Sequence, residues 1–89
     1  MLFISIFSYK PEKRDDVIKR RSEGLFTPEG AKCLGQWSST GGGRTFTLFE
    51  ASDCMVLAQW SVIFSDLGKF EIYPVVDTEE LIKAIKAKK

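Results

Sequence analysis

Histidine is absent from this sequence of 89 residues, and cysteine is scarce. Without histidine, the chain has no Ser-His or Cys-His nucleophile, no His-ligated zinc and no His-bound haem iron. The cysteines, Cys33 and Cys54, are far apart in sequence and belong to no CxxC motif. We therefore expect free thiols in a reducing compartment; a Cys33–Cys54 disulfide is the less favoured alternative.

The sequence also lacks an excess of charge and a long hydrophobic run. Its 13 basic and 12 acidic residues give a net charge of +1, which provides no field to attract nucleic acid. No apolar run approaches the roughly 18 to 20 residues that cross a bilayer. The apolar start, Met1 to Phe7, has no basic segment before it and no cleavage pattern after it. We therefore expect a cytoplasmic protein that binds neither nucleic acid nor a membrane.

The composition is that of a small globular domain. Hydrophobic residues make up 44% and charged residues 28% of the chain. A chain of this length is enough for one domain, which we place at residues 1–89. So small a domain buries only about 60 to 65% of its unfolded-chain surface and is marginally stable. Any further burial of apolar surface would therefore matter.

The order of elements predicts an α+β fold of ferredoxin-like βαββαβ type with an added C-terminal helix. Pro11 suits the start of the first helix, and Gly41 to Gly43 suit a hairpin turn. A type I turn is expected at Thr27 to Gly30. Pro74 cannot donate a ladder hydrogen bond, which predicts an edge strand. Strands are expected at 2–9, 31–39, 44–51 and 69–76, and helices at 12–23, 52–68 and 77–89.

Both faces of the predicted four-stranded antiparallel sheet are apolar. In this fold the two helices cover one face, with the first and third strands in the centre. The first strand nevertheless carries Leu2, Ile4 and Ile6 on one face and Phe3, Phe7 and Tyr9 on the other. The second face therefore needs a cover, either the C-terminal helix or the sheet of a second copy. We favour a homodimer, because Leu81, Ile82 and Ile85 alone make a thin lid.

A series of short motifs, in a particular order and spacing, runs along most of the chain. They are Lys10-Pro11, Pro28-Glu29-Gly30, Trp37, Phe46, Leu48, Glu50, Trp60, Ser65-Asp66-Leu67, Phe70-Glu71 and Pro74-Val75. Through these residues the chain resembles a family described as domain of unknown function 3303, and it departs from that family at the charged first helix and at Gly41 to Gly43. The resemblance implies a ferredoxin-like fold and a dimeric α/β barrel, and no established activity.

Several short motifs have simpler structural interpretations. Gly41-Gly42-Gly43-Arg44 lacks the helix and the Lys-Ser/Thr of a phosphate-binding loop, so a hairpin is favoured. Lys19-Arg20-Arg21 is flanked by acids and is interpreted as a solvated helix face. The acidic pairs Asp15-Asp16 and Glu79-Glu80 are likewise interpreted as solvated, so we predict no metal site and no cofactor.

Two functional hypotheses follow. The first is a dimer that binds or senses a small apolar ligand in a cavity between the two sheets, with Ser5, Phe7, Trp37, Thr47 and Tyr73 as ligand-binding residues. Under it, Phe7→Asp should give a monomer or an aggregate.

The second hypothesis is a cofactor-independent enzyme, resembling a monooxygenase or an isomerase, that acts on a small aromatic or carbonyl compound. Glu50 would be the base, because partial desolvation near the end of a central strand suits a carboxylate to that role. Tyr9 or Tyr73 would donate a hydrogen bond. The structural alternatives are that Glu50 caps the strand exit or pairs with a basic side chain, and that Trp37 is a packed aromatic.

Overall fold

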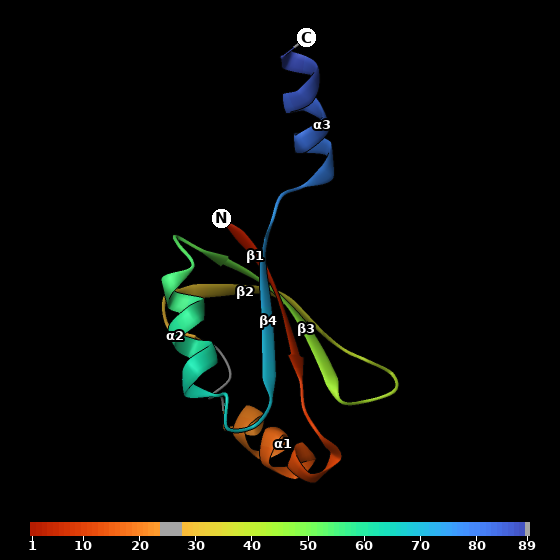
Figure 1. Ribbon diagram of the computed structural model, residues 1–89, viewed down its shortest axis with the longest axis vertical. Helices are drawn as coiled ribbons and strands as arrows, with labels where there is room; N and C mark the ends of the chain where they lie inside the picture. The colour runs from red at the N-terminus through yellow and green to blue at the C-terminus, as the bar shows by residue number, and fades with distance from the viewer. Residues whose placement is uncertain (24–27, 89) are drawn as a thin grey trace.

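The computed structural model describes residues 1–23 and 28–88 and has the predicted α+β fold. The order of elements matches the ferredoxin-like βαββαβ prediction, and the C-terminal helix follows it (Figure 1). Thr27, in the predicted turn, lies outside the described residues. The elements are β1 (Leu2–Ser8), a short 3₁₀ helix η1 (Pro11–Lys13), α1 (Arg14–Ser22), β2 (Ala31–Ser38), β3 (Arg44–Ala51), α2 (Met55–Ile63), β4 (Lys69–Val75) and α3 (Thr78–Ala87).

The four strands form one antiparallel sheet in the order β2-β3-β1-β4. The first and third strands are therefore central, and β4 lies at an edge, as Pro74 predicts. The β2–β3 hairpin closes through a hydrogen bond from the Ser39 amide to the Arg44 carbonyl at 3.0 Å. Gly42 and Gly43 have φ values of 77° and 78° in this turn, which only glycine adopts readily.

One face of the sheet is covered by α1 and α2. Alternate residues of the central strands point to it, and they are buried together with Val17 of α1 and Leu57 and Trp60 of α2. Trp60 lies edge-on to Phe49, with ring centroids 5.3 Å apart, so aromatic packing joins α2 to β3. The strand residues in this core are Phe3, Ser5, Phe7, Thr45, Thr47, Phe49 and Ala51.

The second helix is shorter than its apolar pattern predicts. It begins at Met55, after Cys54 at the N-cap position, and the carboxylate of the preceding Asp53 accepts a hydrogen bond from the Met55 amide at 2.8 Å. It ends at Ile63 instead of continuing to Gly68. The chain then turns, and the Leu67 amide donates to the Phe64 carbonyl at 3.3 Å. Leu67 is thus buried in the core from a turn, although its position three residues after Phe64 also fits the apolar face of a continued helix.

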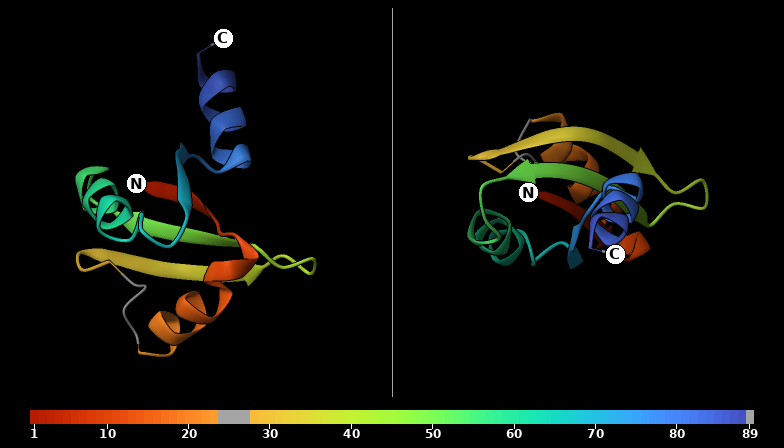
Figure 2. Two further views of the ribbon diagram at one scale, coloured as in Figure 1. Left: turned by 60° about the horizontal axis from the view of Figure 1, so that its bottom comes forward. Right: turned by 90° about the horizontal axis from the view of Figure 1, so that it is seen from above.

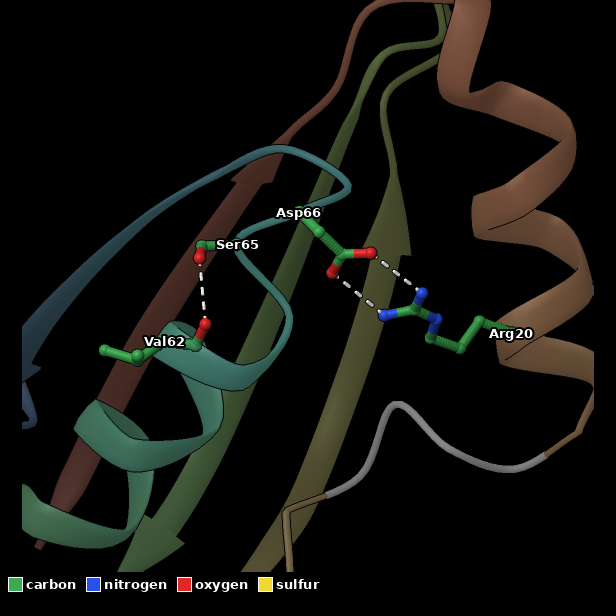
Figure 3. Close-up of polar contacts among 4 residues, drawn as sticks. All are labelled: Arg20, Val62, Ser65 and Asp66. Atoms are coloured by element: carbon green, nitrogen blue, oxygen red, sulfur yellow. Dashed lines mark hydrogen bonds and ion pairs between the residues drawn. The ribbon is translucent and has the colours of Figure 1, made fainter.

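An ion pair joins α1 to the turn after α2 (Figure 3). The Arg20 guanidinium donates to both carboxylate oxygens of Asp66, at 3.1 and 3.0 Å, and also lies over the Phe64 ring at 5.3 Å from its centroid. The hydrogen bond from Arg20 lowers the pKa of Asp66, and the same bond raises the pKa of Arg20. The pair therefore fixes α1 against a segment 46 residues away in sequence.

The helix α3 rises away from the sheet beyond the end of β4 (Figure 2). Its N-terminus is capped by Asp77, which accepts a hydrogen bond from the Glu80 amide at 3.1 Å. None of its residues is buried, and Leu81, Ile82 and Ile85 stay 47%, 46% and 52% exposed. Across the described residues, no helix has both the length and the apolar character needed to span a membrane.

Candidate functional site

The sheet face opposite α1 and α2, here called the open face, is lined by apolar side chains. Strand registers place them in cross-strand rows: Ile4 lies between Leu48 and Tyr73, and Ile6 pairs with Phe46, which in turn pairs with Trp37. Leu2 and Val75 extend the same face toward the start of β1. No described helix covers these residues, and α3 leads away from them (Figure 1). The open face is the second apolar face that the sequence predicts.

Trp37 is the most exposed aromatic side chain of the open face. It is 58% exposed, and its indole folds over Gly35 of the same strand. A Cβ atom at Gly35 would lie only 2.5 Å from Trp37 Cη2, so glycine is what allows the ring to lie flat on the sheet. The alternative that Trp37 is a packed core aromatic is not what the structure shows. The ring instead presents a broad apolar surface to the exterior.

The open face also carries a polar pair on its β4 edge. The Tyr73 hydroxyl donates to Glu71 Oε2 at 2.9 Å, and this hydrogen bond raises the pKa of Tyr73. Lys69 Nζ lies 4.0 Å from the other Glu71 oxygen, Oε1. Sequence reasoning named Tyr73 and missed Glu71, although the two-residue spacing along a strand puts both on one face.

Glu50 and Tyr9, the predicted catalytic pair, lie far apart. Glu50 is exposed on the open face, where its register partners are Leu2 and Lys32. Tyr9 follows the opposite end of β1, roughly 20 Å away at the rise of an extended strand. Its ring contacts Phe7, with centroids 5.7 Å apart, and packs against the helix-covered core. The structure does not bring these two residues into one site.

Tyr9 lies near α1 rather than near the open face. Burial lowers the pKa of Arg21, a half-buried residue of α1, and the nearby Tyr9 acts in the opposite direction. The amide of Tyr9 donates to the Gly43 carbonyl at 3.0 Å, which ties this residue to the β2–β3 hairpin. These contacts hold Tyr9 at the end of the sheet, between the β2–β3 hairpin and the helix-covered core.

Ser5, Phe7 and Thr47 point to the helix-covered face and not to the open face. They are 1%, 2% and 4% exposed, and Ser5 lies opposite Thr47 across the central strand pair. The Thr47 hydroxyl accepts a hydrogen bond from Gln36 Nε2 at 3.1 Å. The five predicted ligand-binding residues therefore lie on two different faces of the sheet. Ser5, Phe7 and Thr47 are on the helix-covered face, and Trp37 and Tyr73 are on the open face.

The placement of Phe7 corrects the expected outcome of Phe7→Asp. Its ring packs 4.6 Å from Phe70, centroid to centroid, beneath the helices. A carboxylate there would be buried in the core of a single chain, so the variant tests folding and not subunit contact. The error arises because both residue sets of β1 are apolar, and alternation alone does not say which set meets the helices.

Metal-ligating and thiol groups are dispersed over the described parts of the chain. Cys33 and Cys54 are free and exposed. Within residues 1–23 and 28–88, no three Cys, Asp or Glu side chains gather in a way that could hold a metal ion.

The fold and its two faces define the class of this protein: a ferredoxin-like α+β domain whose four-stranded sheet has one face covered by helices and one open face. The chain matches the model of the family described as Domain of unknown function (DUF3303) over residues 1–89, and it belongs to that family. No curated protein matches the chain.

Proposed function

We propose that this protein is a homodimeric ligand-binding module in which two copies pack their open faces together as a dimeric α/β barrel. A small apolar ligand would bind or be sensed in the cavity between the sheets. The observation that carries the proposal is the row of uncovered apolar side chains on the open face, centred on Ile4, Ile6, Phe46 and Leu48. The free, exposed thiols of Cys33 and Cys54 suit a protein of the cytoplasm.

The energy available from covering the open face supports a dimer. Burying a large apolar side chain is worth roughly 1.5 to 3 kcal/mol. Trp37 and Tyr73 are 58% and 49% exposed, so about half of that burial energy is still to be gained. Burial of a few such side chains would rival the roughly 4 to 13 kcal/mol that stabilises a domain of this length. A dimer also explains why the C-terminal helix need not cover this face.

The side chains of the open face suit an apolar ligand with one polar group. Packed sheets lie about 10 Å apart, and side chains normally fill the space between them. Gly35 contributes no side chain, so the Trp37 ring lies low against the sheet there. The Glu71–Tyr73 pair supplies the polar contact at the β4 edge. The proposed ligand would therefore lie between Trp37 and Tyr73.

Molar mass in solution tests the dimer. Ile4→Asp places a charge in the centre of the open face, and we expect it to convert a dimer into a monomer with an unchanged circular dichroism spectrum. The matched control is Val62→Asp, because Val62 is 73% exposed on α2 and lies off the open face. A monomeric wild-type protein at micromolar concentration in light scattering would contradict the proposal, as would a dimeric Ile4→Asp variant.

Tryptophan fluorescence tests the cavity. Trp37 reports on the open face, whereas Trp60, at 6% exposed, reports on the core. Neutral aromatic probes such as naphthalene should quench or shift the emission of the wild-type dimer and raise its melting temperature. The change in tryptophan emission should disappear in Trp37→Phe, because Trp60 is then the only tryptophan that emits. An equal response in Trp37→Phe would place the probe elsewhere.

The geometry favours binding over catalysis. A cofactor-independent enzyme with Glu50 as base needs a donor close to that carboxylate. Tyr9 lies at the opposite end of β1, and the Tyr73 hydroxyl is already directed to Glu71. Turnover therefore has less geometric support than ligand binding in this fold.

A further inference from the structure

A cavity of about 600 Å³ opens on the helix-covered side of the sheet, between α2 and the edge strand β4. Phe70, Ile72 and Pro74 form one wall, because alternate residues of β4 point to this side. Cys54, Ala58 and Ser61 form the facing wall along α2, and Phe3 of β1 lies between the walls. The cavity is separated from the open face by the sheet itself.

Packing explains why this space is left empty by the chain's own side chains. Trp60, the large residue of α2, turns toward β3 and β4, with its ring 5.3 Å from Phe49 and 4.6 Å from Phe70 between centroids. Trp60 therefore packs on the strands beside the cavity and is not among its lining residues. Ala58, on the adjacent part of α2, is too short to cross the remaining gap. The resulting volume lies within the roughly 300 to 1,000 Å³ typical of small-molecule sites.

The charge at one end of the cavity limits what can bind there. Asp53 is the charged side chain among the lining residues, which also include Met1 with its N-terminal amino group and contain no Lys or Arg. Its Oδ1 accepts from the Met55 amide at 2.8 Å, and its Oδ2 has no hydrogen-bond partner in the described part of the chain. The N-terminus of α2, which would otherwise attract an anion, is thus already occupied by a carboxylate. An anionic ligand would meet like charge there.

We propose that this cavity binds a small hydrophobic amine, with its apolar body between β4 and α2 and its ammonium group at Asp53. The aromatic and aliphatic walls account for the body, and the unpaired carboxylate oxygen accounts for the amine. This site lies on the opposite side of the sheet from the proposed dimer cavity. Binding of an amine at this site therefore does not depend on whether the protein forms a dimer.

Three probes of similar size and different charge test this inference: phenylbutylamine, phenylbutanol and phenylbutyrate. Cys54 lies in the cavity wall, so alkylation of its thiol by iodoacetamide reports occupancy when Cys33, the other exposed thiol, is replaced in Cys33→Ser. We expect the amine to slow alkylation of Cys54, with the alcohol weaker. The acid should bind about tenfold less tightly than the amine, because an exposed carboxylate attracts one and repels the other.

Two variants separate cavity binding from other effects. Ala58→Phe should fill the cavity and abolish protection by the amine, whereas Gln59→Phe adds the same ring to an exposed neighbour outside the cavity and should leave protection intact. Asp53→Asn keeps an oxygen for the Met55 amide and should reduce the amine to the affinity of the alcohol. Protection that persists in Ala58→Phe overturns the site. Equal affinities of the amine and the acid would refute the choice of an amine as the ligand. If none of the three probes protects Cys54, both the binding site and the ligand class are refuted.

The monomeric Ile4→Asp variant distinguishes this site from one made by two chains. Ile4 points to the open face, so its substitution leaves the cavity walls unchanged. Amine protection of Cys54 should be the same in Ile4→Asp as in the wild type. Loss of protection on dissociation would contradict a cavity formed within one chain.

Discussion

Substitution of two consecutive residues of β1 separates the two faces of the sheet. Phe7 is 2% exposed beneath the helices, whereas Ile6 points to the open face. Truncating a buried phenylalanine to alanine costs about 3 to 5 kcal/mol. We expect the cost for Phe7→Ala to lie at the upper end of this range, because the Phe7 ring also packs against Phe70 and Tyr9, with ring centroids 4.6 and 5.7 Å away. That loss is a large part of the roughly 4 to 13 kcal/mol expected for the whole domain.

Ile6→Ala should behave differently. Its side chain is half-buried in the single chain, so truncation should cost about 1 kcal/mol in the stability of one subunit. The main effect should be on self-association, since the open face loses an apolar side chain next to Phe46. We therefore expect a higher dimer dissociation constant for Ile6→Ala and a lower free energy of unfolding for Phe7→Ala.

Urea denaturation followed by circular dichroism, combined with sedimentation equilibrium, measures both quantities. With a denaturant slope of about 2 kcal/mol per molar, Phe7→Ala should lower the unfolding midpoint by about 2 M. Ile6→Ala should make the midpoint depend less on protein concentration, because less of its stability comes from association. If Phe7→Ala kept the wild-type midpoint and dissociated the dimer instead, the assignment of faces would be refuted.

Two further substitutions test contacts that hold the helix-covered side together. Because the folded-state pKa of Asp66 is lowered by Arg20, the pair stabilises the fold above the unfolded-state pKa, and this stabilisation is lost as the pH falls through the lower folded-state value. Asp66→Asn should thus be less stable than the wild type at neutral pH, with a gap in urea midpoint that closes in acid; a gap that persists in acid would exclude the ion pair as its cause. Gly68→Ala should destabilise by about 1 to 3 kcal/mol, because the new Cβ would collide with the Ser8 carbonyl and lie 2.9 Å from the Phe7 ring. Gly41→Ala, with its nearest atom 3.9 Å away, should leave the melting temperature unchanged, and equal melting temperatures for the two variants would contradict the close approach at Gly68.

Local chemistry predicted the elements whose shape depends on one or two residues. Pro74 placed β4 at the sheet edge because a residue without an amide hydrogen cannot donate within a ladder. The helix predicted from Asp77 starts there in the structure, where the Asp77 carboxylate caps α3 by accepting from the Glu80 amide of the first turn. Glycines at the β2–β3 turn marked the hairpin. Each of these outcomes is decided within a few residues of the chain.

Tertiary packing decided what the sequence pattern left open. The helical spacing of Phe64 and Leu67 continues the apolar stripe of α2, yet the chain turns after Ile63 and still delivers Leu67 to the core. The candidate site was affected in the same way, since Ser5 and Thr47 were assigned to a ligand cavity but lie beneath the helices. The alternation of residues along a strand shows which side chains share a face. It does not show which of the two faces the helices cover, because that depends on where the helices pack.

The edge strand β4, like its neighbour β1, contributes side chains to both proposed sites. Its alternate residues face opposite ways, so Phe70, Ile72 and Pro74 line the amine cavity while Glu71, Tyr73 and Val75 belong to the open face. A substitution on one set therefore leaves the side chains of the other set in place. Among the described strands, β4 pairs with β1 alone and lies at the sheet edge. This arrangement lets the two proposals be tested separately on one strand, with each set of side chains serving as the control for the other.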